Sequence, residues 1–117
     1  MDYEDLLTKA FAAAKQAADI EETTNGHNWF SCGFAWVTIP GNSPLARHCR
    51  KQIAAYSKSG DIPTRDYGDK NYPRGWLFWC PGARITQRMA TYKAAAKAFA
   101  KVLTDAGLDA TVGSRAD

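Results

Sequence analysis

One segment of the chain alternates cationic and aromatic side chains, a combination that can hold phosphates and bases together. It spans residues 64–76, and its candidate contact residues are Arg65, Tyr67, Lys70, Tyr72, Arg74 and Trp76. Cations bind phosphate oxygens and aromatic faces stack on bases, so a site for a nucleotide or a single strand needs both. The alternative is a surface segment whose tyrosines fold back onto the core.

Further basic residues flank this segment in the sequence. An expected helix carries a basic stripe that could lie along phosphates, formed by Arg47, Arg50, Lys51 and Lys58. A solvated helix face is the alternative interpretation, and Arg47 and Lys51 are the candidate contact residues from this stripe. Arg84 and Arg88 lie near the start of a later expected helix, where backbone N–H groups favour anions. Arg115 lies in the last four residues, which by default fray. These five residues complete the candidate ligand-binding set.

The sequence does not support a catalytic or metal site. It contains no Gly-x-x-x-x-Gly-Lys loop, no Gly-x-Ser-x-Gly elbow and no His-Glu-x-x-His motif. All glutamates lie within the first 22 residues, so a paired-carboxylate site is hard to build. The two histidines and three cysteines lack the spacing of structural zinc sites. We therefore expect no metal or cofactor, and a binding protein before an enzyme.

Charge is distributed unevenly along the chain, whose formal net charge is +3. Residues 1–22 carry six acids and two lysines, whereas residues 47–97 carry eleven basic residues and three acids. The 117 residues suit a single domain, 1–117, with an acidic N-terminal helix over 1–22. No apolar run approaches the ~20 residues of a membrane span, and the first residues are acidic, unlike a secretory signal. We expect a cytoplasmic protein without membrane contact.

Hydrophobic periodicity and turn residues predict three helices alternating with three strands. The helices are expected over 3–20, 43–58 and 86–105, the strands over 31–39, 76–80 and 108–112, and a long loop over 61–75. This α-β-α-β-α-β order predicts an α/β (or α+β) domain with parallel crossovers and a small three-stranded sheet covered by helices. Strand 31–39 is apolar on both faces, so we expect it to be central and covered on both sides. Because two of its strands are rich in aromatic residues, we expect that a homodimer could extend or cover this small sheet.

Five short segments together resemble a family of small proteins encoded by tailed bacteriophages and prophages. They are Cys32–Val37, Pro40–Ser43, Gly75–Gly82, Gln87–Met89 and Ser114–Asp117. The resemblance covers residues 27–117 and leaves out the first helix. It implies a phage origin and expression in the cytoplasm of a bacterial host. By analogy with other small phage proteins it suggests an accessory factor such as an inhibitor of host defence.

These observations lead to one main functional hypothesis and two alternatives. The main one is a non-enzymatic phage accessory protein that captures a phosphate-bearing ligand, either a nucleotide or single-stranded nucleic acid. The first alternative is a protein–protein interaction module that inhibits a host protein, because Trp, Tyr and Arg dominate binding hot spots and the chain has four tryptophans. The second is a small enzyme. Nucleic-acid binding is distinguished from a protein partner by its steep fall with added salt.

Overall fold

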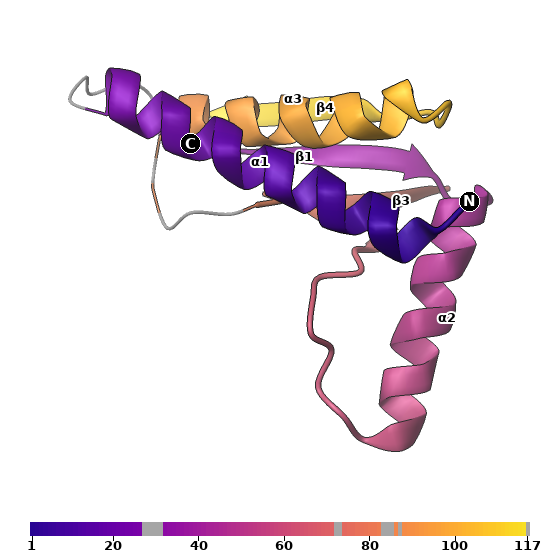
Figure 1. Ribbon diagram of the computed structural model, residues 1–117. Coiled ribbons are helices and arrows are strands. Elements are labelled where there is room, and N and C mark those ends of the chain that lie inside the picture. Colours follow the sequence, from indigo (N-terminus) through magenta and orange to yellow (C-terminus); the bar gives the residue numbers. More distant parts are fainter. Residues whose placement is uncertain (27–31, 72–73, 83–85, 87, 117) are drawn as a thin grey trace.

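The computed structural model describes residues 1–26, 32–71, 74–82, 86 and 88–116, which form three helices and four strands (Figure 1). The elements are α1 (Tyr3–Asn25), β1 (Gly33–Pro40), α2 (Pro44–Ser59), β2 (Asp69–Asn71), β3 (Gly75–Trp79), α3 (Met89–Asp105) and β4 (Thr111–Ala116). No helix in this described part of the chain has both the length and the apolar character that crossing a membrane requires.

The helices begin and end at residues whose side chains or backbone satisfy the free helix termini. The Asp2 carboxylate accepts a hydrogen bond from the Asp5 amide and caps α1. The Ser43 hydroxyl caps α2 in the same way, as predicted from the sequence. At the other end of α2, Gly60 has φ of 81°, a left-handed conformation that favours glycine. Helix α1 extends five residues beyond the predicted end at residue 20.

The structure is an α+β fold with an open four-stranded sheet in the order β2-β3-β1-β4. The predicted order of the three helices and three strands is confirmed. The sheet, however, has a fourth strand within the expected loop. Strand β2 contains only Asp69, Lys70 and Asn71, which give no apolar alternation in the sequence. Its strand conformation depends on pairing with β3.

All neighbouring strands are antiparallel. Because β3 lies between β1 and β2, the strands joined by α2 run in the same direction without being neighbours. The same holds for β3 and β4, which α3 joins and β1 separates. This is the split β-α-β arrangement found in β-α-β-β-α-β folds. The expected parallel pairing is therefore corrected: the extra strand places an antiparallel neighbour between each parallel pair.

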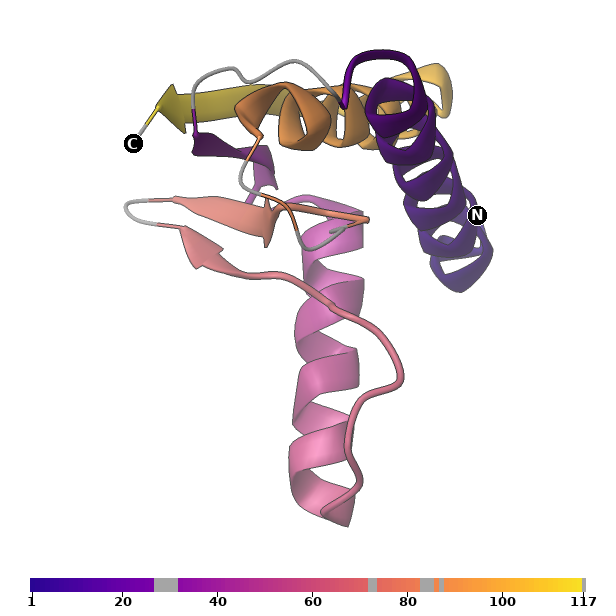
Figure 2. The ribbon, with the colours of Figure 1, turned by 90° about the vertical axis from the view of Figure 1, so that its left-hand side faces the viewer.

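One face of the sheet, which we call the inner face, holds the core. Ala35, Val37 and Phe78 are fully buried there beneath α1 and α3 (Figures 1 and 2). Phe99 of α3 contacts both Phe11 and Phe78, with ring centroids 5.0 Å apart in each pair. Burial of these rings and of the alanine-rich helix surfaces is the main stabilising contribution.

The opposite face, the outer face, is much less covered. Along β1 every second side chain is only half-buried, beginning with Phe34 and Trp36, and Trp79 of β3 is 46% exposed. The prediction that β1 is central is confirmed, since it pairs with β3 and β4. The prediction that both its faces are covered is wrong. The outer face carries large aromatic side chains, whose apolar character in the sequence is the same as that of a buried face.

Helix α2 extends away from the layer formed by α1 and α3 (Figures 1 and 2). Only Leu45, Ala46 and Cys49 are buried along it, all within its first turns. The apolar stripe continues to Ile53, which is 37% exposed. Most of the helix is therefore available for contacts other than core packing.

Candidate functional site

Four basic side chains from three segments line one pocket, which we call the basic pocket. Its volume is about 550 Å³. Arg47 and Arg50 come from α2, Lys70 from β2, and Arg74 from the residue that precedes β3. The remaining lining residues are Gly41, Asn42, Gly75 and Trp76. Among the described residues, no acidic side chain lines this pocket.

The wall of the pocket is fixed by a short chain of contacts. The turn after β1 is held against the start of β3 because the Gly41 amide donates to the Arg74 carbonyl at 2.9 Å. A side chain at position 41 would not fit, since its Cβ would lie 2.6 Å from that carbonyl oxygen. Arg50 donates to the Gly41 carbonyl at 2.6 Å and places its guanidinium carbon 5.6 Å from the centre of the Trp76 ring. This cation–π contact orients Arg50 toward the pocket.

Trp76 forms the floor of the pocket. It is 5% exposed, and its indole N–H donates to the Tyr67 carbonyl at 2.8 Å. Because Arg50 lies over its ring and the residue is nearly buried, the Trp76 indole has little free surface. It therefore supports the cations rather than stacking on a ligand.

The other three cations face solvent. Within the described part of the chain, the side chains of Arg47, Lys70 and Arg74 make no ion pair and no hydrogen bond. Several like charges around one hollow produce a positive potential that concentrates anions. The site thus has the electrostatic character of an anion-binding pocket.

The structure brings some of the predicted site residues together and separates the others. Arg47, Lys70, Arg74 and Trp76 come together in the basic pocket, and Lys51 is exposed on α2 outside the pocket lining. Arg50 belongs to the same basic stripe but not to the candidate ligand-binding set, and its place in the pocket depends on contacts with Gly41 and Trp76. Tyr72 and Arg84 lie outside the described residues.

Arg65 and Tyr67 belong to a network that fastens the loop before β2 to α1. The Tyr67 hydroxyl donates to the Glu4 carboxylate at 2.7 Å, and Arg65 donates to the Glu4 carbonyl and to the Thr8 hydroxyl at 3.2 and 2.7 Å. His48 of α2 also contacts the Glu4 carboxylate. Burial alone would raise the pKa of Glu4, but the hydrogen bonds from His48 and Tyr67 and the Arg65 charge outweigh it, so the pKa is lowered. Both predicted residues therefore have structural partners.

Arg88 lies in a second network, between α1 and the start of α3. Its side chain is 5% exposed and pairs with Glu21 at 3.2 Å and Glu22 at 3.7 Å. It also donates to the Thr91 hydroxyl at 3.0 Å. Arg115, in contrast, is exposed on β4 directly across from Phe34, on the outer face of the sheet.

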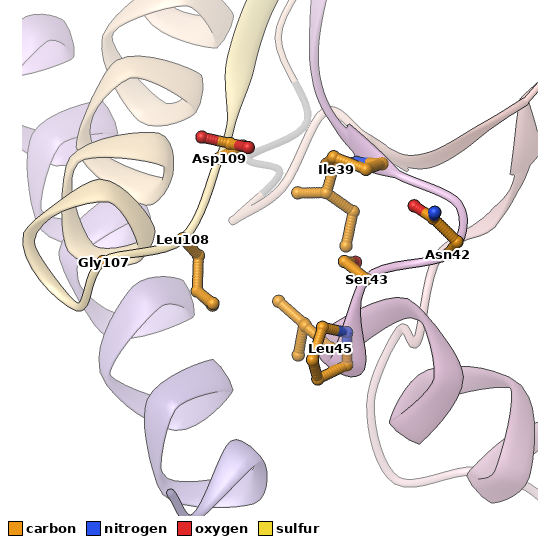
Figure 3. Close-up of a pocket in the computed structure, with 9 residues that line it drawn as sticks. Ile39, Asn42, Ser43, Leu45, Gly107, Leu108 and Asp109 are labelled. Carbon is orange, nitrogen blue, oxygen red and sulfur yellow. The ribbon is translucent and has the colours of Figure 1, made fainter.

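A second pocket, of about 350 Å³, lies between the end of β1 and the segment that joins α3 to β4. Figure 3 shows Ile39, Leu45 and Leu108 around this space, with Asp109 at its margin. Its side chains are mostly apolar, and the single charged group among the described lining residues is the Asp109 carboxylate. This pocket therefore lacks the cations that phosphate recognition requires.

Two of the three cysteines lie in the core. Cys49 and Cys80 are buried, whereas Cys32 is only partly buried. Burial, reinforced by the Glu4 and Asp66 charges, raises the pKa of Cys49 to about 12, and burial also raises that of Cys80. Over the described residues, no three His, Cys, Asp or Glu side chains are grouped to hold a metal ion.

Comparison of the chain with protein-family models, with curated proteins and with solved structures gives no match. The chemistry of the basic pocket and of the sheet surface must therefore supply the functional argument.

Proposed function

We propose that this protein binds a phosphate-bearing ligand, a nucleotide or single-stranded nucleic acid, in the basic pocket. The observation that carries the proposal is the convergence of Arg47, Arg50, Lys70 and Arg74 on one hollow, with no carboxylate among the described lining residues. Arginine donates two parallel hydrogen bonds to phosphate, and lysine supplies a mobile point charge. The pocket volume, about 550 Å³, is within the usual range of small-ligand sites.

The alternative of a solvated helix face accounts for only part of this arrangement. A solvated face explains Arg47 and Arg50, which lie on one helix. It does not explain why Lys70 and Arg74 of the β2–β3 hairpin lie opposite them. Like charges brought together across a hollow repel one another, and a bound anion relieves that repulsion.

The pocket lining also favours binding over catalysis. None of the described residues that line the pocket is a histidine, an acid or a cysteine that could act as a base or nucleophile. The serine, threonine and tyrosine hydroxyls of the described chain also lie outside the lining. We therefore propose capture of the ligand rather than its chemical conversion.

The test is equilibrium binding of a fluorescein-labelled oligothymidylate of about 12 nucleotides, a length within the site sizes of single-strand binders. Fluorescence anisotropy is followed over a salt series, with ATP and pyrophosphate as unlabelled competitors. The variant Arg74→Glu is compared with Lys97→Glu, which makes the same charge change on an exposed part of α3 outside the pocket.

We expect Arg74→Glu to weaken binding about tenfold or more and to reduce the log–log salt slope by about 0.7, the value for one lost phosphate contact with a single strand. Lys97→Glu should stay within about twofold of the parent protein. Equal effects of the two variants, or no binding of any probe at low salt, would contradict the pocket. Native mass spectrometry of protein purified from a bacterial host would identify a nucleotide carried through purification.

A further inference from the structure

Three aromatic rings gather on the outer face of the sheet, on the side away from the basic pocket. We call Phe34 and Trp36 of β1 and Trp79 of β3 the aromatic platform. Trp36 lies directly across from Trp79, with ring centroids 5.4 Å apart and ring planes 6° apart. Phe34 is 5.4 Å from Trp79 by ring centroids, at an interplanar angle of 35°. Trp79 is 46% exposed, so part of this aromatic group is open to solvent.

A glycine on the neighbouring strand allows one of these rings to lie down against the sheet. Gly113 of β4 pairs with Trp36 on the side opposite to Trp79. A Cβ at position 113 would lie 2.4 Å from the Trp36 indole nitrogen and 2.8 Å from its Cζ2. Strand side chains usually stand roughly perpendicular to the sheet. Here the missing side chain lets the indole spread over β4, which widens the platform.

From these contacts we infer that the aromatic platform stacks the bases of a single-stranded nucleic acid. The inference rests on the proposed function and selects one of its two ligand classes. Side chains alternate along β3, so Trp76 faces the basic pocket and Trp79 faces the platform. A mononucleotide cannot reach both faces of the sheet. A polynucleotide passing around the β2–β3 edge can place phosphates on one face and bases on the other.

Charge near the platform fits this ligand. Arg115 lies directly across from Phe34 on β4, where a guanidinium can meet a phosphate or stack on a base. Lys70 and Arg74 lie at the β2–β3 edge, beyond the other side of the platform. The Asp69 carboxylate lies across from Leu77 on that edge. Trp79 also borders a pocket lined by charges of both signs, Lys15, Asp19, Arg65 and Asp66. Arg115 thus lies beside the rings on the outer face, whereas Lys70 and Arg74 line the basic pocket on the other face, which a strand would reach around the β2–β3 edge.

The platform is too small to be the contact of a stable dimer. Three rings of about 200 Å² each, none more than about half exposed, offer roughly 300 Å². Each partner of a stable protein–protein interface covers about 800 Å². Base stacking, in contrast, needs only the faces of the rings. Four-stranded sheets of RNA-binding modules hold two or three bases on aromatic side chains in this way.

The test compares two oligonucleotides with the same backbone, an oligothymidylate and an abasic strand of equal length. The abasic strand carries the same phosphates but no bases. Binding is followed by anisotropy and by quenching of tryptophan fluorescence, for the parent protein and for Trp79→Ala, Trp79→Phe and Ile62→Ala. Ile62 is 87% exposed and lies outside the platform, so its variant controls for loss of exposed apolar area.

We expect the parent protein to bind the base-bearing strand about tenfold or more tightly than the abasic strand, with quenching. Trp79→Ala should remove most of this difference in affinity without changing the affinity for the abasic strand. Trp79→Phe should retain part of the difference, and Ile62→Ala should retain all of it. Equal affinity of the parent protein for both strands would reject base stacking on the platform, but would still be consistent with phosphate binding in the basic pocket. If Trp79→Ala loses the difference in affinity between the two strands but Arg74→Glu leaves the affinity unchanged, the result would support the platform and reject the basic pocket.

Two further results would overturn the inference. Absence of binding to either strand would reject both the pocket and the platform. The second is a dimer, detected by light scattering, that dissociates in Trp79→Ala while the parent protein binds both strands with equal affinity. This result would assign the outer face to contact with a second copy of this chain.

Discussion

The indole rings of Trp36 and Trp79 lie nearly parallel across the β1–β3 pair, with planes 6° apart and centroids 5.4 Å apart. The two residues are direct partners in the register of the strands. Cross-strand aromatic pairs of this kind contribute about 0.5–1.5 kcal/mol beyond the area they bury. The pair therefore both stabilises the sheet and fixes the geometry of its open face.

The position of this pair should depend on Gly113. We expect Gly113→Ala to displace the Trp36 indole, because the new methyl group would overlap the ring. The exciton band of the paired indoles in far-ultraviolet circular dichroism should weaken, and the free energy of unfolding should fall by about 1–2 kcal/mol. Ser114→Ala, an exposed neighbour on the same strand, should change neither quantity. An unchanged exciton band in Gly113→Ala would show that the ring does not depend on this glycine.

Local sequence signals predicted the helices better than the sheet. Caps such as Ser43 and Gly60 act on adjacent residues, so α2 was visible in the sequence. Strand β2 was not visible, because Asp69, Lys70 and Asn71 are polar and form a strand only through β3. The open face was hidden for a different reason: Phe34 and Trp36 look like core residues although they are only half-buried.

The candidate site was predictable only in part, for a similar reason. Basic residues such as Arg74 could be selected by type, but their neighbours depend on contacts between distant segments. Tyr67 has its partner Glu4 at a separation of 63 residues, so its structural role could not be read locally. Arg50 acquires its orientation from Trp76 and Gly41, and nothing near it in the sequence indicates either contact.

The Glu4 network should make stability depend on acid pH. The pKa of Glu4 is lowered from its ordinary value of 4.5. A lowered pKa in the folded state means that the carboxylate stabilises the protein fully above about pH 4.5, and that this contribution is lost as the pH falls through the lowered value. We expect Glu4→Gln to reduce the free energy of unfolding by about 1 kcal/mol at pH 7, a modest amount because the carboxylate is partly exposed.

Urea unfolding of both proteins from pH 7 to acid tests this dependence. The difference between the parent protein and Glu4→Gln should shrink below about pH 4.5 and approach zero when Glu4 is protonated. Tyr67→Phe combined with Glu4→Gln should be less destabilising than the sum of the two, because both remove the same hydrogen bond. A difference that stays constant with pH would contradict the network.

Arg88 should be a structural residue with little influence on ligand affinity. Its buried guanidinium joins Glu21 and Glu22 of α1 to the start of α3. Removing one partner of a buried ion pair leaves uncompensated charge, so Arg88→Ala should lower the free energy of unfolding by about 3 kcal/mol. Arg47→Ala, at an exposed position, should cost less than about 0.5 kcal/mol. Chemical denaturation of the two variants provides the comparison, and equal losses would contradict the assigned roles.

Cys49 should react slowly with alkylating reagents while the protein is folded. The thiolate is the reacting form, and burial together with the Glu4 and Asp66 charges raises the pKa of Cys49 from 9.0 to about 12. At pH 8 this shift lowers the thiolate fraction roughly a thousandfold, before any loss of access is considered. Iodoacetamide labelling followed by peptide mass spectrometry measures the rate at this position, and the same chain in concentrated urea serves as the reference. Labelling should be fast in urea and slow in buffer, and the slow rate should rise in Glu4→Ala as the α1 contact with α2 loosens. Equal rates in buffer and in urea would show that Cys49 is not buried where α2 packs on the core. Such a result would also contradict the position of α2, which carries Arg47 and Arg50 of the basic pocket.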